Sequence, residues 1–413
     1  MIKVCMVVHE DYYIERRVRY ACEALALNGV HVDVLCLRPE HGDCVAPPLG
    51  VRIFSNTRLH TSEKPWTYVL EYGATLLLFT TRLLGLFLRN RYDVIHVHNM
   101  PDFLIFTALV PKIFGSKLIL DIHDPMPEFY ISKYPDRGGY AVRLLRVQEK
   151  LCCKLADEVI TANPNFKNNL VARGIPREKV TVVMNVPNPA VFDRRKRLRH
   201  STGEQFTLIY PGTVAPRYGL DVAIRALPAL SKRIPQVRLV ILGAEGSYAK
   251  YLRDMAAQLR VELLVNVHSQ VPAEEVVRQM AEADVGIYPA LSSPHMDIAT
   301  PTKVMEYAVM GVPIVASRLE VLQQLFGDSA IKYFKAGSVE QFVDCIVELY
   351  NSPRLREELV RKADQAFVRA YPHSSEQGRY FQVMNRLLGT HKLDVDPPMW
   401  NPRTASGDTS PAA

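Results

Sequence analysis

The sequence predicts an α/β protein built from two Rossmann-like, doubly wound domains that face each other across a cleft. Short apolar segments alternate with segments of helical periodicity, the pattern of a parallel sheet covered by helices. The alternation stops at a polar, basic stretch after residue 192 and then starts again. With 413 residues, the chain is long enough for two or three domains of ordinary size.

The first series of elements begins at the N-terminus. Residues 2–8 form an apolar run that ends at polar residues, as expected for a buried parallel strand. A helix is expected over 17–28, with apolar side chains at helical spacing and Gly29 just past its end. Further strands are expected at 30–37, 94–98, 117–121, 158–162 and 180–184.

The second series repeats the same alternation. Strands are expected at 207–210, 238–242, 265–268, 285–288 and 313–316. Helices are expected at 219–234, 248–259, 273–283 and 303–310. We therefore predict an N-terminal domain over 1–192, a basic linker over 193–204 and a C-terminal domain over 205–373. A last helix within 374–390 crosses back onto the first domain, and the Pro-, Ser- and Thr-rich tail 392–413 is expected to be disordered.

Composition narrows the class of protein without naming a function. Hydrophobic residues make up 48% and charged residues 23%, the balance of a soluble globular protein. The seven cysteines include no CxxC pair, and the first apolar run is too short for a secretory signal, so a cytoplasmic location is expected. The net charge of +7 suits a phosphate-bearing ligand or an anionic membrane. The basic cluster 194–199 lacks interleaved aromatics, so no nucleic-acid partner is predicted.

One segment, 66–88, is unusually rich in leucine and phenylalanine. Glu71 and Arg82 interrupt it, which argues against a membrane-spanning helix. Two interpretations remain open. In one, the segment 66–91 lies at the inner face of a membrane as a peripheral anchor, with Arg82, Arg89 and Arg91 reaching lipid headgroups. In the other, the helix packs on the sheet of the first domain.

A candidate anion site follows the first strand of the second series. Pro211-Gly212-Thr213-Val214-Ala215-Pro216-Arg217-Tyr218-Gly219 links that strand to a helix. Gly212 lets the backbone approach a ligand closely, and the N-terminus of the next helix favours anions. Arg217 can make a bidentate contact to a diphosphate. An ordinary tight turn is the alternative.

The segment 300–317 is more specific. Pro301 stands at the start of a helix, Gly311 ends it, and a strand begins at Pro313. Lys303 and Glu306 are three residues apart and therefore share one face of the helix. A carboxylate at that position can accept both ribose hydroxyls of a nucleotide. Taken alone, the pair would equally suit the surface of an ordinary helix.

Together, the segments 208–221 and 300–317 resemble the retaining GT-B glycosyltransferases of family 4 (glycosyl transferases group 1). Weaker similarity lies at 239–243, 283–289, 15–18, 92–98 and 121–128. The resemblance implies that Arg217 and Lys303 neutralise a departing diphosphate and that Glu306 holds the ribose. Gly212, Thr213 and Asp297 are further expected donor contacts. His123 is expected near the reacting sugar, and the acceptor side near Asp11, Tyr12, Arg17 and Asp124.

The implied activity is that of a hexosyl- or related transferase of the EC 2.4 class. A sugar would pass from UDP or GDP to a hydroxyl of a glycan or lipid-linked acceptor, in cell-surface polysaccharide biosynthesis and with retention of configuration. Catalysis would rest on positioning and charge stabilisation, with no metal and no cofactor. Two alternatives stay open: a non-hydrolysing nucleotide-sugar epimerase, and a non-catalytic nucleotide-sugar-binding subunit.

The sequence departs from the family pattern at three places. The first glutamate of the family's Glu-x7-Glu pair would stand at Ile298, next to Asp297. The glycine-rich first loop is replaced by His9-Glu10-Asp11-Tyr12-Tyr13, and Tyr218 stands where a lysine is usual. Two metal-like patterns are dismissed: Asp394-Val395-Asp396 lies in the tail, and His96 and His98 are expected to be polar residues near a strand end.

Overall fold

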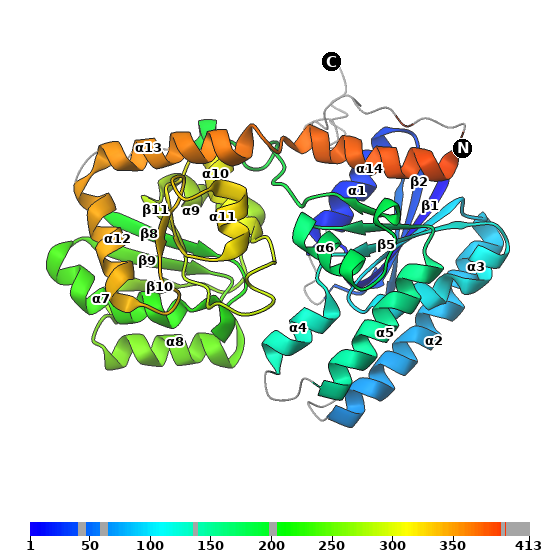
Figure 1. The fold of residues 1–413 in the computed structure, drawn as a ribbon, viewed down its shortest axis with the longest axis horizontal. Helices are drawn as coiled ribbons and strands as arrows, with labels where there is room; N and C mark the ends of the chain where they lie inside the picture. Colours follow the sequence, from blue (N-terminus) through cyan, green and yellow to red (C-terminus); the bar gives the residue numbers. More distant parts are fainter. Residues whose placement is uncertain (40–46, 58–64, 135–138, 198–204, 390–392, 394–413) are drawn as a thin grey trace, which may run out of the picture. The chain divides into compact units, whose positions relative to one another are not determined.

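The computed structural model describes residues 1–39, 47–57, 65–134, 139–197, 205–389 and 393, with side chains from residue 72 onward in the helix that begins at Pro65. The chain divides into two compact units: Met1–Asn185 together with the segment from Ser374 onward, and Val186–His373. Each unit is an α/β structure around one parallel sheet, which confirms the predicted fold class (Figure 1). The first unit ends at Asn185, earlier than the expected residue 192.

The sheet of the first unit has seven parallel strands in the order β3-β2-β1-β4-β5-β6-β7. The strands are β1 (Lys3–Asp11), β2 (His31–Leu37), β3 (Val51–Asn56), β4 (Val94–His98), β5 (Lys117–Ile122), β6 (Glu158–Thr161) and β7 (Val180–Val182). Strand β3 was not predicted; it lies at the edge of the sheet, and only its first and last residues are buried. The order of strands reverses between β1 and β4.

Helices cover both faces of this sheet. One face carries α2 (Pro65–Asn90), the 3-10 helix η1 (Asp102–Ala108), α5 (Gly139–Leu155) and α6 (Pro164–Ala172). The other carries α1 (Arg16–Leu27) and α14 (His373–Leu388) (Figure 1). The shorter helices of this unit are α3 (Leu109–Ile113), α4 (Met126–Lys133) and η3 (Arg177–Lys179).

Leu393 is the described residue of the segment that was expected to form a disordered tail. Leu393 is buried in the same apolar core as α14, and its N–H donates to Asn385 Oδ1 at 2.7 Å. This residue therefore belongs to the first unit, because its side chain fills core space that α14 alone leaves open. The rest of the predicted tail, including Asp394 and Asp396, lies outside the described residues.

Four of the described apolar side chains of α2 lie in the core of the first unit. Phe79, Leu83, Leu86 and Phe87 are buried against the sheet, whereas Leu77 and Leu88 are exposed. The interpretation of this segment as a helix packed on the sheet is therefore correct for its described side chains. Among the described residues, no helix is long and apolar enough to cross a membrane.

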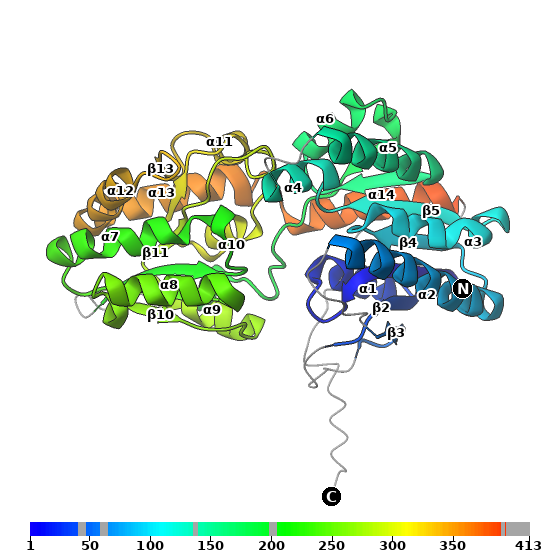
Figure 2. The same cartoon turned by 90° about the horizontal axis from the view of Figure 1, so that it is seen from below.

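The second unit has six parallel strands in the order β10-β9-β8-β11-β12-β13. The strands are β8 (Phe206–Pro211), β9 (Val237–Leu242), β10 (Val265–Val267), β11 (Val285–Tyr288), β12 (Ile314–Ser317) and β13 (Lys332–Phe334). The helices are α7 (Leu220–Arg233), α8 (Gly246–Gln258), α9 (Ala273–Glu282), α10 (Thr302–Met310), α11 (Glu320–Phe326), α12 (Val339–Asn351) and α13 (Pro353–Ala363). Figure 2 shows α7 and α8 side by side on this sheet.

Short helical turns complete the second unit, and one of them corrects the linker prediction. The turns are η4 (Arg194–Lys196), η5 (Pro216–Tyr218), η6 (Glu262–Leu264) and η7 (Asp364–Val368). Residues 194–197 were expected to be a solvated linker, but Arg194 donates to the Ala308 carbonyl and to Asp364. The described part of the basic stretch therefore packs onto the second unit; residues 198–204 lie outside the described residues.

Candidate functional site

The segments that the sequence analysis singled out meet at one edge of the second sheet. The order of strands reverses between β8 and β11, which are hydrogen-bonded neighbours. Ligands of open α/β sheets bind outside the carboxyl ends of the strands at such a reversal. Gly212 directly follows β8, Pro289 directly follows β11, and α10 begins nearby at Thr302.

Two glycines allow the backbone around this edge to come close together. Gly212 has a φ of +119°, and a Cβ there would lie 3.1 Å from Lys303 Cε. Gly219 has a φ of +62°, and a Cβ there would lie 2.1 Å from the carbonyl oxygen of Pro289. Both positions therefore require glycine, for conformation and for space. The neighbour that approaches Gly212 is the Lys303 side chain.

Lys303 is held in an aromatic cage. Its ammonium lies 4.7, 4.4 and 5.6 Å from the ring centroids of Tyr210, Tyr218 and Tyr288. The side chain is buried, and burial lowers the pKa of the ammonium, while Tyr218 and Glu306 act in the opposite direction. Cation–π attraction of this kind positions a charged group without a direct ion pair.

Tyr218 contacts Lys303, a role that the sequence pattern did not indicate. It departs from the family pattern as a missing lysine, but its ring faces the Lys303 ammonium. The guanidinium carbon of Arg217 also lies 4.8 Å from the same ring, and Arg217 Nη2 lies 3.5 Å from the Tyr218 hydroxyl. One tyrosine side chain therefore contacts both predicted phosphate-binding cations.

A histidine that the sequence analysis did not select lies beside Arg217. His295 is buried, and burial together with the charge of Arg217 lowers its pKa to about 4. The imidazole is therefore neutral at neutral pH. The signal in the sequence was weak, since His295 stands alone in a loop and belongs to no recognised motif. The backbone links this loop to the first one, because Leu291 N–H donates to the Arg217 carbonyl at 2.9 Å.

Glu306 is buried in α10, one turn beyond Lys303, as the spacing predicts. The next residue, Tyr307, fixes the helix against the sheet. Its hydroxyl lies 2.8 Å from the Ile209 carbonyl of β8 and 3.2 Å from the Ile287 carbonyl of β11. A Cβ at Gly286 would lie 2.6 Å from the Tyr307 ring, so the strand needs glycine there. Tyr307 thus sets the depth at which Lys303 and Glu306 sit.

The arrangement can bind an anion next to a polyhydroxyl group. Lys303 and Arg217 supply positive charge, and the N-terminus of α10 adds the partial charge of its free amide groups. Glu306 supplies a carboxylate that can accept hydrogen bonds from hydroxyls. A diphosphate attached to a ribose matches both parts.

Two residues expected to contact the donor, Asp297 and Thr213, form hydrogen bonds within their own segments. The Asp297 carboxylate accepts from the Ser292 hydroxyl at 2.7 Å, within its own loop. Ile298, where the family carries a glutamate, is half-buried. Thr213 is exposed, and its carbonyl accepts from the Tyr210 hydroxyl at 3.0 Å. The surroundings of Asp297 and Thr213 are therefore less defined by side chains than those of Lys303 and Arg217.

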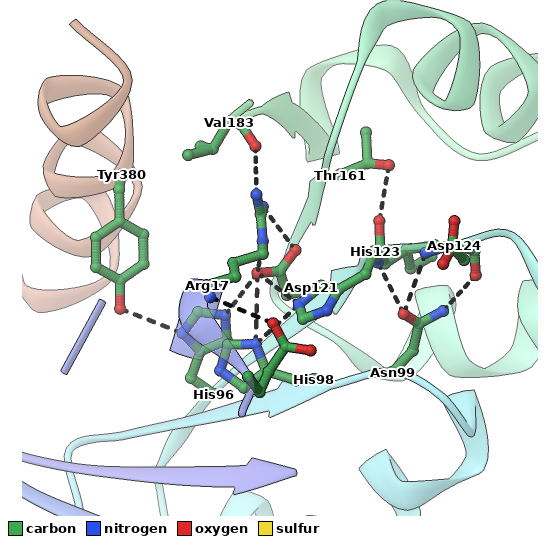
Figure 3. Close-up of polar contacts among 12 residues, drawn as sticks. Arg17, His96, His98, Asn99, Asp121, His123, Asp124, Thr161, Val183 and Tyr380 are labelled. Carbon is green, nitrogen blue, oxygen red and sulfur yellow. Dashed lines mark hydrogen bonds and ion pairs between the residues drawn. The ribbon is translucent and has the colours of Figure 1, made fainter. Parts of the chain in front are cut away.

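A second cluster of polar side chains lies in the first unit, around Asp121 of β5 (Figure 3). Arg17 Nε and Nη2 donate to the two carboxylate oxygens of Asp121 at 2.8 and 2.9 Å, and Nη1 donates to the Val183 carbonyl at 2.8 Å. Burial alone would raise the pKa of Asp121, but Arg17 and then His123 hold it well below its ordinary value. Arg17 is thus a bidentate partner of Asp121, and its expected place on the acceptor side stays a prediction.

Three histidines surround the same carboxylate. His96 and His98 stack at 4.1 Å, and His98 Nδ1 lies 3.1 Å from His123 Nε2. His123 Nε2 lies 3.4 Å from Asp121 Oδ2, and the His96 Nδ1 atom lies 3.2 Å from the Tyr380 hydroxyl of α14. Burial lowers the pKa of both His96 and His98, so these rings are neutral at neutral pH.

His96, His98 and Asp121 place one potential ligand atom each within 4.8 Å of one another, the spacing of a metal site. The charge distribution opposes that use. Asp121 already carries a bidentate Arg17, whose guanidinium would stand next to the metal cation. We interpret the group as a hydrogen-bonded network that orients His123, whose side chain is the most exposed of the three histidines at 15%.

The other predicted acceptor-side residues differ in accessibility. Tyr12 is 1% exposed in the apolar core, because β1 continues to Asp11 and turns the next side chain inward. It therefore lies among core side chains, a correction to its placement on the acceptor side. Asp11 is also buried, and its Oδ1 accepts from the Tyr13 N–H at 2.9 Å. Asp124 directly follows His123, and its carbonyl accepts from Asn99 Nδ2 at 2.7 Å.

Two parallel α/β units, one carrying a cationic site at its strand reversal, define the GT-B class of glycosyltransferase folds. The model of the glycosyl transferase 4-like domain matches residues 14–186, and that of glycosyl transferases group 1 matches residues 193–366. The chain therefore belongs to the GT-B glycosyltransferases of family 4, group 1.

The chain is similar to several curated proteins over part of its length. A GDP-mannose-dependent alpha-(1-6)-phosphatidylinositol monomannoside mannosyltransferase of Mycolicibacterium smegmatis is 36% identical over 126 residues, 30% of this chain and 33% of that protein. The alpha-galactosylglucosyldiacylglycerol synthase of Streptococcus pneumoniae is 26% identical over 221 residues, 50% of this chain and 55% of that protein. The matches thus span one third to just over half of these relatives.

Solved structures match over almost the whole chain. Sucrose-phosphate synthase from Thermosynechococcus elongatus gives a TM-score of 0.76 at 16% identity, covering 95% of this chain and 100% of that one. WaaG, a glycosyltransferase involved in lipopolysaccharide biosynthesis, gives a TM-score of 0.66 at 16% identity, covering 94% and 100%. At these identities the likeness establishes the fold.

Proposed function

We propose that the protein is a retaining glycosyltransferase that moves a sugar from a nucleoside diphosphate to a hydroxyl group. The observation that carries the proposal is the buried Lys303 ammonium, held over Gly212 at the carboxyl end of β8. A buried cation without a carboxylate within ion-pair distance among the described residues is costly unless an anion completes its surroundings. A donor diphosphate supplies that anion.

In this proposal each side chain has one task. Arg217 and Lys303 stabilise the negative charge that grows on the diphosphate as its bond to the sugar breaks. Glu306 accepts hydrogen bonds from the ribose hydroxyls, and the Gly212 backbone permits close approach of the phosphates. The leaving phosphate oxygen takes the proton of the attacking hydroxyl, so the sugar keeps its anomeric configuration. His123, whose ring Asp121 and His98 orient, is the proposed catalytic histidine of the first unit.

The substrates are proposed at the level of chemical class. The mycobacterial relative uses GDP-mannose by its name, and a structural relative from Anabaena, HepE (TM-score 0.63, 13% identity), was crystallised with UDP. UDP or GDP sugars are therefore the proposed donors. Other relatives act, by name, in amylovoran biosynthesis and in diacylglycerol glycolipid synthesis. We accordingly propose a glycan or lipid-linked acceptor in cell-surface polysaccharide synthesis.

The test is transfer of labelled sugar from UDP- and GDP-sugars to a lipid extract. Transfer supports the proposal, whereas an epimerised donor would identify a nucleotide-sugar epimerase, and binding without turnover a non-catalytic subunit. The same assay with EDTA tests the proposed independence of metals. Loss of transfer on chelation, restored by Mn²⁺ or Mg²⁺, would contradict it.

Two matched variants test the proposal that Glu306 binds the ribose. Glu306→Gln removes the buried carboxylate, whereas Glu274→Gln changes an exposed glutamate in the first turn of α9. We expect about tenfold or greater loss of nucleotide affinity in calorimetry for the first, because charged hydrogen bonds contribute about 1.5–3 kcal/mol, and no loss for the second. Equal affinities for both variants would place the ribose elsewhere.

We also propose peripheral contact with an anionic membrane on its cytoplasmic face. The exposed apolar side chains favour α5, rather than α2, as the surface that contacts the membrane. Tyr140, Leu144, Val147 and Leu151 are spaced by four, three and four residues, and each is more than half exposed. In α2, by contrast, Phe79, Leu83, Leu86 and Phe87 face the core.

The charges around this stripe favour lipid over a second copy of the chain. Arg143, Arg146, Lys150 and Lys154 are exposed on the same helix, and its acidic residue, Glu149, is buried against Arg173. A second copy would bring like charges together, whereas anionic headgroups would neutralise them.

A further inference from the structure

A cavity of about 430 Å³ lies in the second unit, away from the site at Gly212. Gly311, which ends α10, and Pro313, which precedes β12, line it. It therefore lies at the amino end of β12. Lys303 lies near the opposite edge of the sheet, where the carboxyl ends of the strands are. Its volume falls in the range of small-molecule sites, about 300–1,000 Å³.

The lining is strongly basic. Five arginines reach it from three segments, against two carboxylates, Glu357 and Asp364. The arginines are Arg194, Arg197, Arg356, Arg361 and Arg369. Arg194 and Arg197 come from the basic stretch that follows the first unit, Arg356 and Arg361 from α13, and Arg369 from the turn after it.

Part of this charge has a structural explanation. Arg194 donates to the Ala308 carbonyl at the end of α10, and Arg356 donates to the Tyr350 carbonyl at the end of α12. Cations at helix C-termini are stabilised by the helix dipole. Asp364 accepts from Arg194 at 2.9 Å and from Arg369 at 2.8 Å.

Carboxylates among the described residues balance only part of this charge. Arg197, Arg356 and Arg361 have no carboxylate partner within 4.0 Å in the described part of the chain. Burial lowers the pKa of Arg197; Asp284 opposes this effect, while the charges of Arg356 and Arg194 reinforce it. Its hydrogen bond to the Met280 carbonyl is long, at 3.4 Å. Mutually repelling guanidinium groups in one concavity attract a counter-anion.

We propose that this cavity is a second anion site that binds a phosphate-bearing small molecule, separate from the donor diphosphate. Guanidinium groups pair with phosphate oxygens through two parallel hydrogen bonds, so Arg197, Arg356 and Arg361 can each supply a fork. Gly311 allows the Arg194 side chain to pack against the end of α10, because a Cβ there would lie 3.0 Å from Arg194 Nε. The site is independent of the proposed function.

Binding of inorganic pyrophosphate to the full chain, measured by calorimetry, tests the proposal. Lys303→Gln weakens the proposed donor site, so a larger share of the pyrophosphate that this variant still binds lies at the second site. We expect Arg361→Gln, made in the Lys303→Gln background, to weaken that binding about tenfold, because one charge-assisted contact is lost. Arg361 is exposed, so its replacement leaves the fold intact.

Arg354→Gln in the same background is the matched control. Arg354 is also an exposed arginine of α13, but it does not line the cavity. Unchanged pyrophosphate binding in Arg354→Gln together with weakened binding in Arg361→Gln supports the site. Equal affinities in the two variants, whether both weakened or both unchanged, would overturn it.

Vesicles distinguish a soluble phosphate from a lipid headgroup. We expect pyrophosphate to bind in solution. We also expect Arg361→Gln to leave binding to phosphatidic acid vesicles unchanged. Arg361-dependent binding to those vesicles without pyrophosphate binding would overturn the proposal of a soluble ligand and assign the cavity to the membrane surface.

Discussion

The Lys303 ammonium lies 4.4 Å from the centre of the Tyr218 ring. This contact joins the start of α10 to the loop after β8, two segments that contain the predicted phosphate-binding residues. Residue 218, where the family pattern described above has a lysine, therefore contacts the lysine of α10 instead. The ring positions the lysine that remains.

The first prediction concerns Lys303 itself. Lys303→Gln is expected to lower kcat/KM for sugar transfer by about 10²–10³, because a preorganised charge next to the leaving group is lost. Steady-state kinetics checks this, with Lys250→Gln, an exposed lysine of α8, as control. Unchanged kcat/KM in Lys303→Gln would remove this lysine from the catalytic site.

The second prediction separates the two parts of Tyr218. Tyr218→Phe keeps the ring and should retain most activity, whereas Tyr218→Leu loses a cation–π contact worth about 0.5–2 kcal/mol. We therefore expect the leucine variant to bind nucleotide about 2- to 30-fold more weakly than the phenylalanine variant. Equal affinities for the two variants would show that the aromatic face has no part in holding Lys303.

The third prediction concerns the turn before α7. Gly219→Ala places a Cβ 2.1 Å from the Pro289 carbonyl oxygen and requires a positive φ, so it should destabilise the fold by about 3 kcal/mol or more. Gly246→Ala is the control, since its φ is +75° but no atom lies within 4 Å of the added Cβ. That variant should lose only about 1–2 kcal/mol. Urea unfolding measures both; similar losses would contradict the close approach at Pro289.

The fourth prediction concerns pH. The pKa of His295 is lowered to about 4 in the folded chain, against about 6.5 when it is unfolded. The unfolded chain therefore takes up the proton first, and the free energy of unfolding falls as the pH drops from about 6.5 to 4, by up to about 3 kcal/mol. Above pH 6.5 this contribution is constant, because the imidazole is neutral in both states.

Replacing the histidine isolates its share of the pH dependence. His295→Asn should show a smaller fall in unfolding free energy over that range, measured by urea denaturation at several pH values. His268→Asn, at an exposed position, should keep the full dependence. If the His295 variant retains the wild-type dependence, the burial of a neutral imidazole is not its source.

The fifth prediction tests the exposed stripe of α5. Leu144→Glu should reduce co-flotation with phosphatidylglycerol vesicles about tenfold or more, because a leucine side chain is worth about 1.5–3 kcal/mol when buried. Leu263→Glu changes a leucine of the second unit that is even more exposed, and it should float like the wild type. Undiminished flotation of Leu144→Glu would exclude α5 as the contact surface.

The local pattern of the sequence was sufficient for the fold class and for selecting residues that meet at the cationic edge of the second sheet. The alternation of strands and helices predicts two parallel sheets, because only that arrangement buries runs that are apolar on both faces. Gly212, Lys303 and Glu306 could be selected from turn chemistry and helical spacing. Parallel topology then brings the ends of β8 and β11 to one edge, where these residues meet.

Only the tertiary structure decided which side chains surround that site and which are lost to the core. The tyrosine cage, the neighbour of Arg217 at His295, and the bidentate pair of Arg17 with Asp121 join residues from separate elements, so no local spacing predicts them. Tyr12 shows the opposite case, a residue predicted at a site but buried in the core. Sequence periodicity shows which face of a helix or strand is apolar; whether that face meets a sheet or solvent depends on packing, as α2 and α5 demonstrate.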